Sequence, residues 1–128
     1  MSLSSYFETT RGTGVLATAD DAGRVDAAIY ARPHIDDKGT IAFIMRDRLT
    51  HHNLQSNPRA TYLFIEDGPG YKGKRLFLLK TAEAQDPEKI AAMRRRQRIA
   101  DSDEMKFIVY FTLEKELPLI GAGPVQPD

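Results

Sequence analysis

Two tight turns of the same kind place the strongest constraint on how this chain can fold. They are "DDAG", Asp20 to Gly23, and "DDKG", Asp36 to Gly39, and each lies between short runs rich in apolar and β-forming residues. Aspartate favours such turns because its carboxylate accepts backbone N–H groups, and glycine favours them because it adopts positive φ. Strands joined by short turns pair antiparallel, since a parallel pair needs a long crossover connection. We therefore expect an antiparallel meander rather than β-α-β units.

The rest of the sequence continues this pattern of short strands. Turn residues separate six runs that we expect to form strands, at residues 14–20, 24–35, 40–46, 59–67, 75–85 and 105–116. A small barrel suits this number of strands because it removes exposed sheet edges. The sequence therefore predicts a mainly β fold, a six-stranded antiparallel barrel with short flanking helices.

Each expected helix begins after a residue whose side chain can cap its first turn. The expected helices are residues 5–10 after Ser2 or Ser4, residues 51–57 after Thr50, and residues 86–100 after Asp86. The last of these is the clearest, because it has proline in its first turn and arginines toward its end, where cations complement the helix dipole.

Composition narrows the possible functions. With 128 residues, 41% of them hydrophobic and 28% charged, the chain has the composition of one globular domain, residues 1–128. It contains no cysteine, which excludes disulfides, zinc-thiolate and iron–sulfur sites, and thiol nucleophiles. Eighteen basic residues balance eighteen acidic ones, so no net field attracts nucleic acid or an anionic membrane. Since we find neither a signal peptide nor an apolar run of about 20 residues, we expect a cytoplasmic protein.

Two clusters of ligand-type side chains have simpler explanations than a metal or nucleic-acid site. His51 and His52 are adjacent, so on a helix they point about 100° apart and cannot reach one ion. The densest basic run is "MRRRQR", Met93 to Arg98, which has no interleaved aromatic residues. A solvated helix face or a subunit contact explains this run, and a nucleic-acid-binding barrel remains the alternative.

The segment from Met45 to Thr50 has the features of a phosphate site. An apolar strand ends at Met45, Arg46 and Arg48 follow, and Thr50 precedes a short helix. Alternate residues of an extended segment project to the same side, so both guanidinium groups can converge on one dianion. A helix start adds unpaired N–H groups and the positive end of the dipole. Exposed arginines beside a helix start are the alternative explanation.

The order of these elements resembles that of a known family. The stretches "AAIYARPHI" and "TIAFIMR" are followed by "HHNLQSNPRATYLF", in which a helix closes on Asn-Leu and Asn-Pro precedes a strand. Over about residues 12–84, the chain is similar to the pyridoxamine 5'-phosphate oxidase-like FMN-binding split barrels. The resemblance implies a split barrel and a homodimer with two FMN sites at its interface.

The resemblance also implies which residues contact FMN. Those along the isoalloxazine ring and ribityl chain are Ile29, Tyr30, Ala31 and Arg32, those at the facing strand end are Ile44, Met45 and Arg46, and those at the phosphate are Arg48, Leu49, Thr50 and His51. Many relatives carry a lysine at the helix start, where this chain has Thr50 and His51. Arg46 or Arg48 must therefore supply the cation here.

In function, the resemblance implies an FMN-binding oxidoreductase of the flavin-reductase type that uses a small-molecule substrate or electron donor. The alternative is a non-catalytic FMN-binding or electron-carrier protein. No side chain is expected to act as a general acid or base, because the flavin carries the redox chemistry. Arg32 or a backbone N–H is the candidate donor to the flavin N1/C2=O edge. Tyr71, in the glycine-rich loop 68–74, either stacks on the flavin or lies at an exposed hairpin tip.

Overall fold

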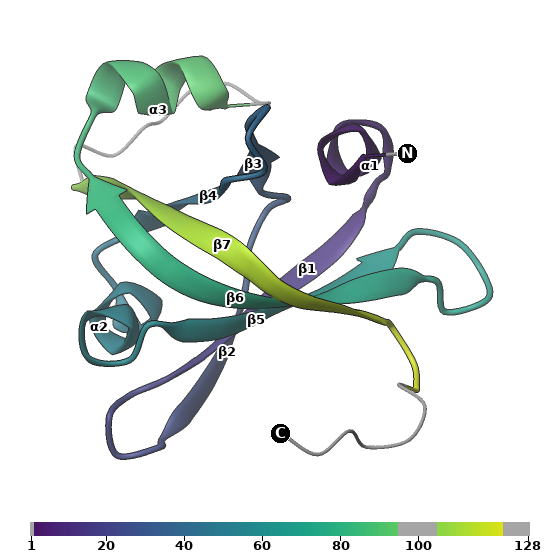
Figure 1. The fold of residues 1–128 in the computed structure, drawn as a ribbon, viewed down its shortest axis with the longest axis horizontal. Helices are drawn as coiled ribbons and strands as arrows, with labels where there is room; N and C mark the ends of the chain where they lie inside the picture. Colours follow the sequence, from purple (N-terminus) through teal and green to yellow (C-terminus); the bar gives the residue numbers. More distant parts are fainter. Residues whose placement is uncertain (1, 95–104, 122–128) are drawn as a thin grey trace.

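The computed structural model describes residues 2–94 and 105–121, and within them the chain forms seven strands and three short helices (Figure 1). The strands are β1 (Gly12–Ala19), β2 (Val25–Ile29), β3 (His34–Ile35), β4 (Ile41–Arg46), β5 (Arg59–Glu66), β6 (Gly73–Ala84) and β7 (Lys106–Pro118). The helices are α1 (Leu3–Thr9), α2 (Leu49–Ser56) and α3 (Pro87–Met93). All strand pairs are antiparallel, which confirms the predicted mainly β, antiparallel architecture.

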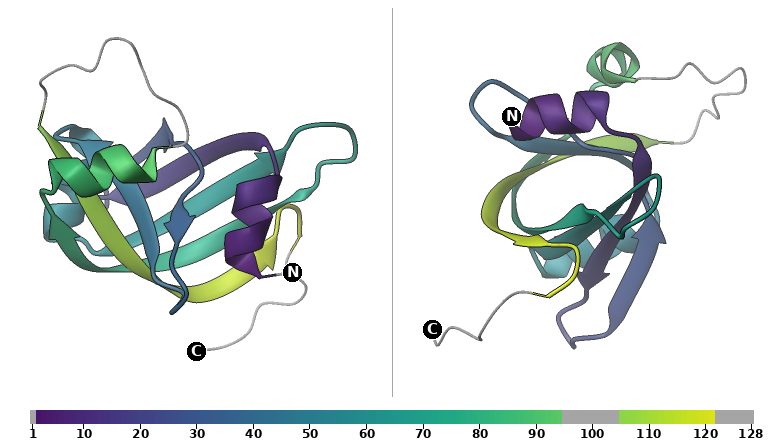
Figure 2. Two further views of the ribbon diagram at one scale, coloured as in Figure 1. Left: turned by 90° about the horizontal axis from the view of Figure 1, so that it is seen from above. Right: turned by 90° about the vertical axis from the view of Figure 1, so that its right-hand side faces the viewer.

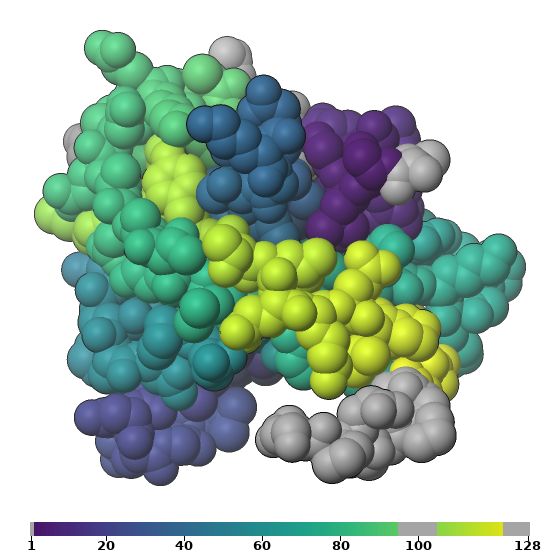
Figure 3. Space-filling view, in the orientation of Figure 1, coloured from purple at the N-terminus to yellow at the C-terminus, as the bar shows by residue number. Residues whose placement is uncertain are grey.

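The strands form one sheet that curls on itself without closing (Figure 2). Their order is β2-β1-β5-β6-β7-β4-β3, so β2 and β3 are the two edges. The turn between β1 and β2 projects from the body of the molecule, as the space-filling view also shows (Figure 3). This arrangement fits a split barrel, in which the split lies between two edges of one sheet.

The structure has one strand more than the six predicted, because residues 24–35 form two strands instead of one. β2 ends at Ile29 and β3 begins at His34. Pro33 lies between them, lacks a backbone N–H and restricts the residue before it, so the strand cannot continue through it. Because β2 pairs with β1 and β3 pairs with β4, the connection between them carries the chain from one sheet edge to the other.

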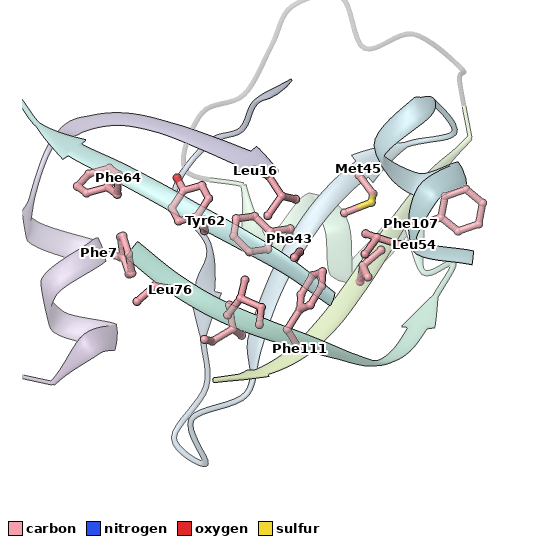
Figure 4. Packing of buried hydrophobic residues seen from close by; sticks show 14 residues of the cluster. Phe7, Leu16, Phe43, Met45, Leu54, Tyr62, Phe64, Leu76, Phe107 and Phe111 are labelled. Carbon is pink, nitrogen blue, oxygen red and sulfur yellow. The ribbon is translucent and has the colours of Figure 1, made fainter. Parts of the chain in front are cut away.

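The hydrophobic core lies inside the curled sheet, between α1 at one end and α2 at the other (Figure 4). Alternate residues of each strand point inward, as in β1, where Gly14, Leu16 and Thr18 are buried. Phe7 of α1 and Leu54 of α2 are buried in the same core. The two helices are thus fixed against the sheet by apolar burial. Burying each large apolar side chain stabilises the folded state by about 1.5–3 kcal/mol.

Two of the predicted helix caps are confirmed. Ser2 caps α1 with its side chain, which accepts the Ser5 N–H at 3.1 Å. Asp86 caps α3 in the same way, by accepting the Lys89 N–H at 3.1 Å. The predicted helix was longer, but α3 ends at Met93 with the next residue extended. Most of "MRRRQR" and the predicted remainder of the helix lie outside the described residues.

Candidate functional site

A cavity of about 940 Å³ lies at the split of the barrel, between the β2 edge of the sheet, the end of β4 and the start of α2. Its volume is within the range of about 300–1,000 Å³ that is usual for small-molecule sites. Of the residues predicted to bind the cofactor, those that line this cavity are Ile29, Tyr30, Ala31, Arg32, Ile44, Met45, Arg46, Arg48, Leu49 and Thr50. The structure therefore brings these residues together around one space.

The described residues that line the cavity include more basic than acidic side chains. The basic ones are Arg11, Arg32, Arg46, Arg48, Arg94 and Lys106, and the acidic ones are Asp26 and Asp67. An excess of cations in a concave, partly desolvated site raises the local potential and attracts anionic ligands, even though the whole chain is neutral. We refer to this space, defined by its lining residues, as the basic cavity.

The turn from Arg46 to Arg48, which we call the basic turn, joins β4 to α2. The Arg48 N–H donates to the Arg46 carbonyl at 2.9 Å, so the chain reverses tightly between the two arginines. Arg46 and Arg48 both line the basic cavity. Arg48 is also the N-cap residue of α2, and its guanidinium has no acceptor to offer the first-turn N–H groups. These N–H groups lie at the N-terminal end of α2. That end is at the cavity, because Leu49 and Thr50 both line it.

The prediction that Thr50 caps α2 is wrong. The helix begins one residue earlier, at Leu49, so Thr50 lies inside its first turn and is buried. Its side chain instead hydrogen-bonds to the hydroxyl of Tyr30. Burial raises the pKa of the Tyr30 hydroxyl, and the hydrogen bond with Thr50 opposes this effect only in part. Tyr30 is therefore a neutral hydroxyl at the cavity wall.

The backbone of Tyr30 is fixed as firmly as its side chain. Its N–H donates to the Gly14 carbonyl at 2.9 Å, and its carbonyl accepts the Tyr62 hydroxyl at 3.0 Å. Gly14 permits the second contact, because a Cβ at that position would lie 1.8 Å from the Tyr62 hydroxyl oxygen. The missing side chain of Gly14 thus lets a core tyrosine support the wall of the site.

Arg32 lines the basic cavity, and it also holds α1. Its Nη1 donates to the carbonyls of Phe7 and Thr10, at 2.8 Å and 2.9 Å. Cations near the last carbonyls of a helix are stabilising because those groups have no partner within the helix. The sequence-based expectation gave Arg32 a role toward the flavin, whereas the structure also gives it a role in fixing the N-terminal helix.

His51, expected as a phosphate ligand, lies outside the cavity lining. Its ring nitrogens face carboxylates, with Nδ1 3.0 Å from Asp47 Oδ1 and Nε2 2.9 Å from Glu83 Oε2. The ring also stacks on Phe107, with 3.9 Å between the ring centroids. The structure therefore directs this side chain into the protein, behind the basic turn.

The sequence analysis missed several lining residues, among them Arg11 and Asp67. They meet because β1 pairs with β5 with Gly12 opposite Glu66, and the Asp67 N–H donates to the Arg11 carbonyl at 2.9 Å. Such a register joins residues far apart in the chain, and a single sequence carries no signal for it. Tyr71 is an exposed residue beyond Asp67 and lies outside the lining.

In residues 2–94 and 105–121, no three His, Asp or Glu side chains are grouped so that they can hold a metal ion. In the same ranges, no helix has both the length and the apolar character needed to cross a bilayer.

Known structures share this fold. An FMN-binding protein from Syntrophomonas wolfei subsp. wolfei aligns with a TM-score of 0.74 and 18% identity, covering 91% of this chain and 83% of that one. An F420 reductase aligns with a TM-score of 0.72 and 14% identity, covering 91% and 97%. HupZ from Group A Streptococcus aligns with a TM-score of 0.70 and 15% identity, covering 97% and 96%. At these identities the similarity establishes a common fold.

Among curated proteins, no sequence relative matches the chain. The family of this chain is therefore assigned from a match to a family model, and the fold agrees with that match. The model described as pyridoxamine 5'-phosphate oxidase matches residues 5–114, which is most of the chain, and the chain therefore belongs to the pyridoxamine 5'-phosphate oxidase-like family of split barrels.

Proposed function

We propose that the basic cavity binds FMN and that the protein is an FMN-dependent oxidoreductase of the flavin-reductase type. One observation carries this proposal: a single cavity combines a phosphate-type end with an apolar rim. The basic turn and the start of α2 form the phosphate-type end, while Ile29, which is 71% exposed, forms part of the apolar rim. FMN has the matching halves, a dianionic phosphate and a largely apolar tricyclic ring.

The residues present fit this cofactor. Arg46, Arg48 and the first-turn N–H groups of α2 would hold the phosphate, because guanidinium groups and helix starts both favour dianions. The segment from Ile29 to Arg32 would line the ring, with the Tyr30 backbone held in place by Gly14 and Tyr62. Bound FMN would supply the hydride or electron transfer, and the protein would supply orientation and electrostatics.

A larger anionic flavin-type cofactor is the alternative ligand. The described residues that line the basic cavity include six basic side chains, and this charge also suits an anionic cofactor other than FMN. The fold is shared with an F420 reductase, which supports including F420 among the ligands to be tested. A non-catalytic FMN carrier would use the same binding residues and differ only in lacking turnover.

We further propose that the protein acts as a homodimer. Ile29, Val15 and Leu63 form a row across β2, β1 and β5, on the sheet face opposite the core residues Leu16 and Tyr62. Ile65 extends this outer apolar face and is exposed. Ile29 belongs both to this face and to the rim of the cavity, so a second copy on the face would also cover the cofactor site.

The test begins with the visible spectrum of the purified protein, followed by steady-state oxidation of NADH and NADPH after loading with FMN. A flavin spectrum together with turnover supports the oxidoreductase. A flavin spectrum without turnover for either donor identifies a carrier instead. Absence of a flavin spectrum, together with no binding of added FMN at micromolar concentrations, contradicts the proposal.

A further inference from the structure

The buried side chain of His51 lies directly behind the basic turn. We propose that His51 is a positioning residue: through Asp47 it holds the basic turn in the orientation that binds a phosphate ester. This inference rests on the proposed function, because it concerns the affinity of the same cavity for FMN.

The ring of His51 is held on several sides. Its side chain is 8% exposed, and its two nitrogens lie 3.0 Å from Asp47 Oδ1 and 2.9 Å from Glu83 Oε2. The ring stacks on Phe107 with 13° between the planes. Both nitrogens can donate to the two carboxylates together only when the ring is protonated, and one can donate when it is neutral. In either state, His51 connects the turn before α2 to the sheet.

The anchor on the sheet side is Glu83, near the end of β6. Its Oε1 accepts from Lys80 Nζ at 2.6 Å and from Gln55 Nε2 at 2.9 Å. Burial alone would raise the pKa of Glu83, but the hydrogen bonds from Gln55, Lys80 and His51 outweigh it and lower this pKa to about 2. Glu83 is therefore an ionised, well-held partner at neutral pH.

Asp47 lies between the two arginines of the basic turn and points the other way. Arg46 and Arg48 line the basic cavity, whereas Asp47 contacts His51, which lies outside the lining. The hydrogen bond from the Arg48 N–H to the Arg46 carbonyl holds the backbone of the three residues in one tight turn. The contact between Asp47 and His51 therefore fixes the back of the turn, and the front carries the two guanidinium groups.

Electrostatics alone predicts the opposite effect for Asp47. Its carboxylate adds negative charge close to an anion-binding site, so removing that charge should strengthen the binding of a phosphate dianion. The positioning role predicts weaker binding, because the turn loses its attachment to His51. The sign of the change therefore separates the two explanations.

The experiment titrates FMN and riboflavin against the full chain and three variants, using quenching of flavin fluorescence. Asp47→Ala should raise the Kd for FMN roughly fivefold or more, with less than a twofold change for riboflavin. Asp47→Asn removes the charge but keeps an acceptor for His51, so it should bind FMN at least as well as the natural chain. Asp37→Ala makes the same change of charge in another turn, away from the cavity lining, and should leave both ligands unchanged.

Asp47 is 62% exposed, so its replacement should leave the fold intact, and the thermal midpoint verifies this. Unchanged or tighter FMN binding by Asp47→Ala overturns the inference. Asp47 would then affect the site only through its negative charge. An equal loss of FMN and riboflavin overturns it as well, since a general structural role would explain that result. If the natural chain shows no preference for FMN over riboflavin, the proposed function fails first, and this inference fails with it.

Discussion

The side chain of Thr50 hydrogen-bonds to the hydroxyl of Tyr30, and this contact joins the first turn of α2 to the residue that follows β2. Both residues line the basic cavity. Two walls that are far apart in the sequence are thereby connected directly. The site is preorganised to this extent by the protein itself, so less ordering is required when a ligand binds.

Replacing Tyr30 with phenylalanine tests this connection. The ring and both backbone hydrogen bonds remain, but the buried Thr50 hydroxyl loses a partner. Tyr30→Phe should lower the free energy of unfolding by about 1 kcal/mol, measured by urea titration. Tyr71→Phe is the control, because Tyr71 is 75% exposed, and it should have little effect. Equal losses in both variants would show that the contact with Thr50 contributes nothing.

Removing a guanidinium from the basic turn should affect ligands with a phosphate selectively. Arg46→Ala should weaken FMN binding by about 1.5–3 kcal/mol, because a charged hydrogen bond is lost, and it should change riboflavin binding much less. Calorimetric titration with the two ligands measures this difference. A similar loss for both ligands would place Arg46 against the ring or in a purely structural role.

Glu83 makes the stability of the protein depend on pH. Its pKa lies at about 2, below its ordinary value of 4.5, so the folded state favours the ionised form. This stabilisation is present above the unfolded pKa and is lost as pH falls through the folded one. Glu83→Gln should therefore lower the free energy of unfolding by about 2 kcal/mol near neutral pH, measured by urea titration.

The same pair of proteins provides the control for this prediction. The difference between Glu83→Gln and the natural chain should shrink between about pH 5 and pH 2, because the unfolded chain binds a proton at Glu83 near pH 4.5, whereas the folded carboxylate stays ionised down to about pH 2. A difference that stays constant over this range would contradict an electrostatic role for Glu83. It would indicate instead that the substitution disturbs packing.

Gly14 is the glycine at which a side chain should be most costly to this site. A Cβ there would lie 1.8 Å from the Tyr62 hydroxyl oxygen, so Gly14→Ala must displace a buried core residue and its contact with Tyr30. We expect a loss of about 3 kcal/mol in unfolding free energy. Gly39→Asn is the control, because the φ of +85° at Gly39 suits asparagine. A Cβ added there would meet no atom within 4 Å other than those of its chain neighbours. Its effect should be small, and an equal loss in both variants would contradict the steric explanation.

The turns were predictable from the sequence because their determinants are local. Asp20 Oδ1 accepts the N–H groups of Ala22 and Arg24 at 2.9 Å, and Asp36 Oδ1 accepts those of Lys38 and Thr40 at 2.9 Å. Each donor lies within four residues of its acceptor, so a stretch of five residues identifies the turn. The antiparallel architecture followed from these turns.

Two side chains lie differently from what the local sequence predicts, because of contacts made across the fold. Thr50 was predicted to cap α2, but its side chain is directed to Tyr30, which lies beyond β3 and β4 in the sequence. His51 was grouped with the phosphate ligands from its place in the motif, and Glu83 on a distant strand draws it away from the cavity. Local spacing identified which segment forms the site, whereas the direction of each side chain depends on partners that only the folded sheet supplies.

The most direct test of the central claim is the relative affinity of the natural chain for FMN and riboflavin, which differ only in the phosphate. With Arg46, Arg48 and the start of α2 at one end of the basic cavity, FMN should bind at least about tenfold more tightly than riboflavin at low salt. The preference should shrink as salt screens the exposed charges. Equal affinity for the two ligands, or no binding of either at micromolar concentrations, would contradict the account.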